Sequence, residues 1–272
     1  MGVNNILVPI NYSGCSINAL RHAGNLAKQF KCQILILHAL NNDNIATAEE
    51  IENQKAEHVK KINDLITSEP SLSMIMSEAL VSEESPKDAI LWATNTFNID
   101  LIVIGTEGIH KPYIDLVGSF TYHVISESNL PVLTIPEDCA YVKPHKIGFG
   151  VDFKIMDPSA VLEMVKQFTR GFNSKLEIFH IKAFGEETKP KEVKQSEILN
   201  NFFNDINHNF ITLEQGSVQE GLKAYAEKYD PNILAIMPRK YKFFEWLKHE
   251  SVTEDAVQHL QLPILTIPES LK

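Results

Sequence analysis

The sequence predicts an α/β protein built from two tandem repeats of a doubly wound, five-stranded parallel sheet. Three observations lead to this fold class: the chain length, an internal repeat, and the alternation of short apolar runs with helical segments. A chain of 272 residues exceeds what one hydrophobic core usually organises, and domains of about 150 residues give two. We therefore expect one domain over residues 1–140 and a second over residues 141–272.

Several segments of the first half recur in the second half. The segment LPVLTIPE at 130–137 recurs as LPILTIPE at 262–269, an offset of 132 residues. The same offset aligns the segment that starts at Ser85 with the one that starts at Ser217, without a gap. Residues 5–11 align with residues 146–152 at a larger offset of 141. Such self-similarity indicates two copies of one structural unit.

Strands and helices alternate within each half. Short, nearly continuous apolar runs predict buried parallel strands at 6–10, 34–38, 101–104 and 132–135. Helical spacing predicts helices over 16–30, where Leu20, Ala23 and Ala27 share one stripe, and over 85–97. We expect residues 41–68 to form a loop followed by a solvated helix, 137–146 a linker, and 185–194 a mobile loop. This alternation favours a doubly wound sheet with ligands at the carboxyl ends of its strands.

Charge and cysteine usage exclude several classes of function. The formal charge is −10, of which residues 1–140 carry −9, and an acidic surface repels the phosphates of nucleic acid. The N-terminus lacks a basic region before its apolar run, and no window reaches the roughly 18 apolar residues of a membrane span. Cys15, Cys32 and Cys139 are scattered without CxxC spacing, as is typical of reduced thiols. We expect a cytoplasmic protein that binds neither nucleic acid nor membrane.

A glycine-rich loop follows the strand predicted at 101–104. It reads Gly105-x2-Gly108-x9-Gly118-Ser119. Glycine lets the backbone turn sharply and approach an anion closely, and Ser119 begins a helix whose unpaired N–H groups and dipole favour phosphate. Taken singly, each glycine could be a turn residue and Ser119 a simple N-cap. Their joint spacing favours a phosphate site.

This spacing resembles the universal stress protein family, whose nucleotide-binding members carry G-2x-G-9x-G-[S/T] after the fourth strand. The resemblance covers both halves and implies an adenine-nucleotide alpha-hydrolase, Rossmann-like fold with dimer-like pairing through the last strand. It also implies ATP or AMP, with or without magnesium, held by phosphate contacts from the loop and by adenosine contacts after the first two strands. The nucleotide-binding residues that it implies are Pro9, Asn11, Ala39, Leu40, Gly105, Gly108, Gly118, Ser119 and Phe120.

Two residues of the first half depart from the family pattern. Asn11 stands where the family has an Asp; it can still form hydrogen bonds but lacks the charge that assists a metal. Glu107 stands where a basic residue is common, and a carboxylate beside phosphates weakens binding. His110 and Lys111 follow in the same loop and can offset that charge.

The second half has lost most of the loop pattern. Met237, Lys240 and Glu250 take the places of the three glycines, and Ser251 alone keeps its identity. Ser251 and Glu254 have the spacing of a capping box, in which the helix satisfies its own N–H groups. Asp152 matches the family's Asp after the first strand, or is an ordinary strand-end acid. We expect no nucleotide in this half.

Three hypotheses of function follow. The first is a stress-response module that binds ATP or AMP in its first domain, with the second as an intramolecular pseudodimer partner. The second is a structural or regulatory scaffold without nucleotide, in which strands 132–135 and 264–267 pair edge to edge. The third, an ATP-dependent enzyme, rests on analogy of fold.

No general base or Walker lysine adjoins the loop, and His123 is expected to pack or face solvent. We predict no catalytic residue and no metal ligand, with at most weak ATPase activity. A homodimer and an unidentified protein partner remain open.

Overall fold

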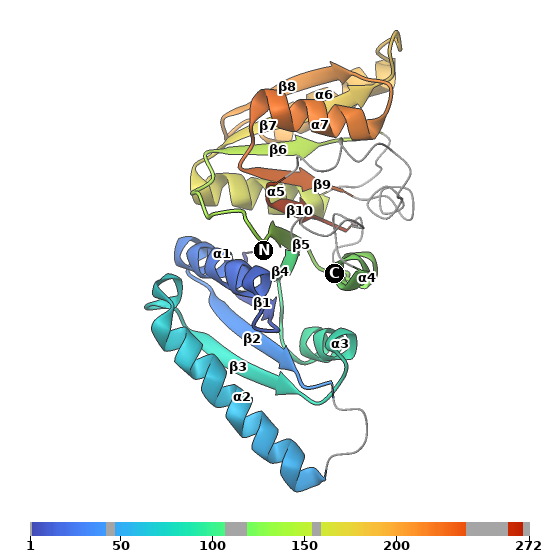
Figure 1. Cartoon of the computed structure of the whole chain (residues 1–272). Helices are drawn as coiled ribbons and strands as arrows, with labels where there is room; N and C mark the ends of the chain where they lie inside the picture. Colours follow the sequence, from blue (N-terminus) through green and yellow to red (C-terminus); the bar gives the residue numbers. More distant parts are fainter. Residues whose placement is uncertain (1, 42–46, 107–118, 154–158, 238–260, 269–272) are drawn as a thin grey trace. The chain divides into compact units, whose positions relative to one another are not determined.

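A computed structural model describes residues 2–41, 47–106, 119–153, 159–237 and 261–268 (Figure 1). They belong to two compact units, Gly2–Tyr141 and Val142–Lys272. In each unit parallel strands are joined by helices. The predicted α/β class is therefore confirmed.

The first unit contains five strands and four α-helices among its described residues. They are β1 (Asn5–Pro9), α1 (Gly14–Phe30), β2 (Gln33–Ala39), α2 (Ala48–Ser68), a 3-10 turn η1 (Pro70–Leu72), β3 (Ser77–Ser82), α3 (Pro86–Thr96), β4 (Leu101–Thr106), α4 (Ser119–Glu127) and β5 (Val132–Pro136). The four predicted strands and two predicted helices of this half lie within two residues of these bounds.

The strand order of this unit is β3-β2-β1-β4-β5, with every pair parallel. The chain therefore moves outward from β1 to β3 and then crosses back to β4 beside β1. In Figure 1, α1 and α2 lie on one side of this sheet and α3 and α4 on the other. The direction of winding changes between β1 and β4, and such a switch point is where doubly wound sheets bind ligands.

Local sequence explains the first helix. Ser13 caps α1 by accepting a hydrogen bond from the Ser16 N–H. The stripe predicted from helical spacing packs on the sheet, since Leu20 and Ala23 are fully buried. The helix ends at Lys31, which adopts a left-handed φ of 56°.

Helix α2 is the solvated helix predicted after residue 41. Thr47 and Glu50 form a capping box at its start. Of its 21 residues, all of which are described, only Ile62 is buried. Helix α2 therefore buries little apolar surface, and its capping box contributes to its stability.

The second unit repeats the arrangement. Its described elements are β6 (Lys146–Gly150), α5 (Ser159–Phe172), β7 (Lys175–Lys182), α6 (Pro190–Phe202), β8 (His208–Glu214), α7 (Val218–Tyr229), β9 (Ile233–Ile236) and β10 (Ile264–Thr266). Their order is β10-β9-β6-β7-β8, again parallel. This order matches that of the first unit, with β6 in the place of β1.

One prediction about a connecting segment needs revision. The mobile loop expected over 185–194 ends early, because Pro190 opens α6 and the Glu192 carboxylate accepts from the Lys189 N–H at 3.3 Å. The linker expected over 137–146 contains no helix or strand before β6 begins at Lys146, and hydrogen bonds hold its first residues. There the Asn18 amide donates to the carbonyls of Pro136, Glu137 and Cys139 at 2.9, 3.1 and 2.9 Å.

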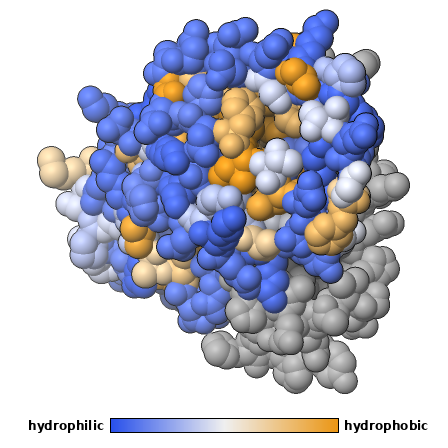
Figure 2. Space-filling view, turned by 90° about the horizontal axis from the view of Figure 1, so that it is seen from above, coloured by the Kyte–Doolittle hydropathy of each residue, from blue (hydrophilic) through white to orange (hydrophobic). Residues whose placement is uncertain are grey.

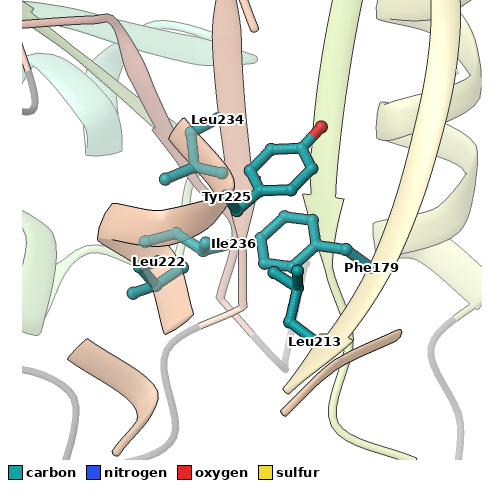
Figure 3. Packing of buried hydrophobic residues seen from close by; sticks show 6 residues of the cluster. All are labelled: Phe179, Leu213, Leu222, Tyr225, Leu234 and Ile236. Carbon is teal, nitrogen blue, oxygen red and sulfur yellow. The ribbon is translucent and has the colours of Figure 1, made fainter. Parts of the chain in front are cut away.

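The core of the second unit is built around Tyr225. Figure 3 shows its ring against Phe179, and the two are stacked with centroids 3.9 Å apart. A Cβ at Gly148 would lie 2.5 Å from this ring, so glycine makes room for it. The Tyr225 hydroxyl donates to the carboxylate of Glu177, which is 3% exposed, at 3.1 Å. Burial and this carboxylate raise the pKa of Tyr225.

The face shown in Figure 2 is mainly hydrophilic. Figure 2 shows apolar residues gathered near the middle of one face and surrounded by hydrophilic ones. Patches of this kind are normal on folded chains and carry no assignment alone.

Candidate functional site

The expected ligand residues of the first unit follow three neighbouring strands. Pro9 ends β1, Ala39 ends β2, and Gly105 is the second-to-last residue of β4. Because β2, β1 and β4 are adjacent and parallel, their carboxyl ends meet at one edge of the sheet. The fold therefore brings these three residues to the same edge, together with Asn11 and Leu40.

Gly105 has a packing role that its sequence context did not reveal. It lies inside β4, opposite Ile135, and not in a sharp turn after the strand. A Cβ there would lie 2.3 Å from the carbonyl oxygen of Cys15, a backbone atom that cannot rotate away. The expectation that Gly105 serves a turn is therefore corrected: it allows β4 to approach the start of α1.

Asn11 is bound within its own turn. Its Oδ1 accepts from the N–H of Ser13 at 3.1 Å and from the Ser13 hydroxyl at 2.5 Å. A backbone N–H can only donate, so this contact fixes the amide with its oxygen toward Ser13. The residue is exposed, and it offers the amide NH₂ group as a donor rather than an acceptor to a ligand.

Three side-chain rings lie next to this turn, and the sequence did not predict that they meet. The Tyr12 hydroxyl lies 3.0 Å from Nδ1 of His58, and the rings of His38 and His58 stack with centroids 4.2 Å apart at 18°. The ring of Tyr12 lies 4.8 Å from that of His38. Nδ1 of His38 donates to the carbonyl of Ile10 at 3.0 Å. We call Tyr12, His38 and His58 the ring cluster.

The ring cluster is partly buried, and burial controls its ionisation. Burial, followed by the charge of Glu57, raises the pKa of Tyr12 to about 12. Burial, followed by the neighbouring His38, lowers the pKa of His58. Both shifts favour the neutral forms at neutral pH. In the repeat, the structure places Phe153 and His180 at the positions of Tyr12 and His38. The offset of 141 residues aligns His38 with Phe179 instead, so the sequence repeat did not reveal this pair.

Only part of the glycine loop can be placed. Gly108 and Gly118 lie outside the described residues, as do Glu107, His110 and Lys111. Ser119 is the first residue of α4, as expected for a helix opened by the loop, and Phe120 follows it at 36% exposure. The Thr121 hydroxyl donates to the carbonyl of Gly105 at 3.4 Å, which ties α4 to β4.

Of the two expectations for His123, packing or facing solvent, the structure shows the second. Its side chain is 53% exposed, and its Nδ1 lies 3.8 Å from a carboxylate oxygen of Glu127. Within the described ranges, no group of three or more His, Cys, Asp or Glu side chains is arranged to hold a metal ion. In the same ranges no helix is both long enough and apolar enough to cross a bilayer.

In the second unit, Met237 directly follows β9 and is partly exposed. Lys240, Glu250, Ser251 and Glu254 lie outside the described residues, so the expected capping box stays a prediction. Asp152 lies two residues beyond β6, at the position expected from the repeat.

Comparisons with known proteins agree with this architecture. The sequence model of the universal stress protein family matches residues 2–136. Universal stress protein YxiE of Bacillus subtilis (strain 168) is 26% identical over 145 residues, covering 48% of this chain and 98% of that protein.

Two solved structures are similar over nearly the whole chain. A universal stress protein from Archaeoglobus fulgidus DSM 4304 has a TM-score of 0.78 at 16% identity, covering 99% of this chain and 100% of that one. A putative universal stress protein from Pseudomonas aeruginosa UCBPP-PA14 has a TM-score of 0.63 at 12% identity, covering 98% and 93%. At such identities the likeness concerns the fold alone. Residues 2–136 are therefore a domain of the universal stress protein family.

Proposed function

We propose that the first unit binds an adenine nucleotide, ATP or AMP, at the carboxyl ends of β2, β1 and β4. The observation that carries this proposal is the strand order, which puts Asn11, Ala39 and Gly105 beside the switch point between β1 and β4. The spacing of Gly108, Gly118 and Ser119 then supplies the phosphate contacts. In this proposal the second unit is a pseudodimer partner without nucleotide.

The first experiment is to denature freshly purified protein and identify released nucleotide by mass spectrometry. One ATP or AMP per chain supports the proposal. Two per chain contradict the assignment of an empty second unit. No released nucleotide, together with no binding at millimolar ATP with and without magnesium, contradicts nucleotide binding altogether.

Variants locate the site. Gly118→Glu introduces the residue that the second half carries at Glu250, and Ser119→Ala removes one hydroxyl. A hydrogen bond to a charged group contributes about 1.5–3 kcal/mol, so each change should weaken binding about tenfold or more. Ser251→Ala is the matched control, because it removes the corresponding hydroxyl from the second half. Equal losses for Ser119→Ala and Ser251→Ala would contradict the assignment.

A scaffold without nucleotide remains the second candidate, and two observations favour it. The oxygen of Asn11 is already occupied by Ser13, and Gly105 has a packing role that needs no ligand. Under this hypothesis Gly118→Glu leaves the binding of protein partners unchanged. Loss of a partner with Gly118→Glu would instead make nucleotide the signal.

A further inference from the structure

The ring cluster connects helix α2 to the turn that holds Asn11. Tyr12 follows Asn11 directly and adopts a left-handed φ of 63°, which is uncommon outside glycine. Its hydroxyl contacts His58, which lies on α2. This contact couples the position of α2 to that of Tyr12.

A comparison with the second unit shows which contacts of the ring cluster are shared by both units and which occur in the first unit. There Phe153 lies 4.6 Å from His180 at an angle of 49°, and Tyr12 lies 4.8 Å from His38 at 47°. His180 donates to the carbonyl of Val151 at 2.9 Å, as His38 does to that of Ile10. The pair of an aromatic ring and a histidine is thus common to both units.

Beyond this shared pair the two units differ. The space beside Phe153 and His180 is a cavity of about 70 Å³, lined from α6 by Glu192 and Ser196. In the first unit, His58 from α2 instead stacks on the shared histidine and meets a hydroxyl that phenylalanine lacks. The unit with the nucleotide motif therefore carries an extra contact between its second helix and the turn after its first strand.

We propose that Tyr12, His38 and His58 form a proton-sensitive latch that holds α2 against the Asn11 turn at neutral pH and releases it as His58 gains a proton. The latch regulates the nucleotide site proposed above, and its effect on affinity rests on that proposal.

The direction of the pH effect follows from the surroundings of His58. Burial, His38 and Lys61 make its protonation less favourable, and Glu57 acts in the opposite direction. Lys55, one turn earlier, is paired with Glu52 at 3.1 Å and with Glu83 at 2.5 Å.

The latched form therefore holds fewer protons than a form in which His58 is free to titrate near its usual pKa of about 6.5. The latch is complete above that pH and weakens as the pH falls below it. Affinity for nucleotide should follow the same direction.

The experiment measures affinity for a fluorescent ATP analogue at pH 7.5 and 5.5 in the full chain and in Tyr12→Phe and His58→Gln. Tyr12→Phe reproduces the residue of the second unit, and His58→Gln keeps an acceptor for Tyr12 without a titrating ring. Protonation of the ligand's own phosphates affects all proteins equally. Beyond that common change, we expect wild type to lose affinity by roughly fivefold or more at low pH. Both variants should show only the common change.

His180→Gln is the control in the second unit, since it alters the ring that corresponds to His38, and it should retain the wild-type pH dependence. If Tyr12→Phe and His58→Gln also retain it, the latch is refuted.

A second measurement does not depend on nucleotide. The backbone amide signals of Asn11 and Ser13 are followed by NMR between pH 5 and 8, beside the ring protons of His58. We expect the amides to titrate with His58 in wild type and to stop doing so in His58→Gln. If the amide signals of Asn11 and Ser13 do not titrate with His58, the latch is refuted even if ATP binds. If the amide signals titrate with His58 but ATP does not bind, the proposed function is refuted and the latch is supported.

Discussion

Gly105→Ala tests whether the first glycine of the loop is needed by the fold itself. The added Cβ would lie 2.3 Å from the Cys15 oxygen and 3.0 Å from the Ser16 nitrogen. Since real Cβ atoms essentially never approach closer than 3.0 Å, β4 and the start of α1 must separate by about 0.7 Å. Overpacking of this kind costs about 1–3 kcal/mol.

The structure also supplies the comparison variants. Gly24→Ala meets the backbone oxygen of Ser71 at 2.6 Å, so it should destabilise the protein in the same way. Gly14→Ala meets only the tip of the Glu137 side chain, at 2.7 Å, and that carboxylate can rotate away. Gly14→Ala should therefore be close to neutral.

Amide hydrogen exchange of peptides from β1 and β4 measures the effect in the first unit, with thermal unfolding beside it. A loss of about 2 kcal/mol corresponds to a midpoint lower by roughly 5–10 °C. If Gly105→Ala and Gly14→Ala are equally stable, the close approach of β4 to α1 is wrong. If Gly105→Ala is destabilised and Gly14→Ala is not, lost nucleotide binding in Gly105→Ala cannot be attributed to a phosphate contact.

Three further predictions concern buried or capping groups. Tyr225→Phe leaves Glu177 without its hydroxyl donor, which should cost about 1–3 kcal/mol in urea unfolding; an unchanged midpoint would contradict the contact. Burial lowers the pKa of His22, whose ring bonds the Cys139 carbonyl at 2.9 Å, so stability should fall as the pH drops below about 6.5. His22→Gln should flatten this fall when thermal midpoints at pH 7.5 and 5.5 are compared, and an equal fall in both proteins would refute it. Asn11→Asp puts a negative charge at the N-terminus of α1 and should stabilise the first unit by about 0.3–1 kcal/mol, measured by amide exchange; a loss of stability would argue against the turn geometry.

Strands and helices were predictable because their signals are local. The apolar runs at 34–38 and 101–104 correspond to β2 and β4, and the stripe of Leu20 and Ala23 is the buried face of α1. The error over 185–194 has a local cause as well. A charged, proline-containing segment was interpreted as a loop, although proline is favoured in the first turn of a helix, where Pro190 lies.

The site was predictable only where spacing along the chain carried the information. The loop from Gly105 to Ser119 could be recognised from its spacing, but the reason for glycine at 105 could not, since Cys15 lies 90 residues away in sequence. The ring cluster was missed for the same reason. Tyr12, His38 and His58 come from three separate elements, and no periodicity or short motif joins them.

The sequence by itself determined the repeat, the α/β class and the family, because apolar periodicity and motif spacing are properties of neighbouring residues. Only the tertiary structure decided the strand order, the packing of Gly105 against Cys15, the commitment of the Asn11 oxygen to its own turn, and the meeting of three rings over β1 and β2. These features depend on which distant segments pack together, and that is set by the whole core rather than by any stretch of chain.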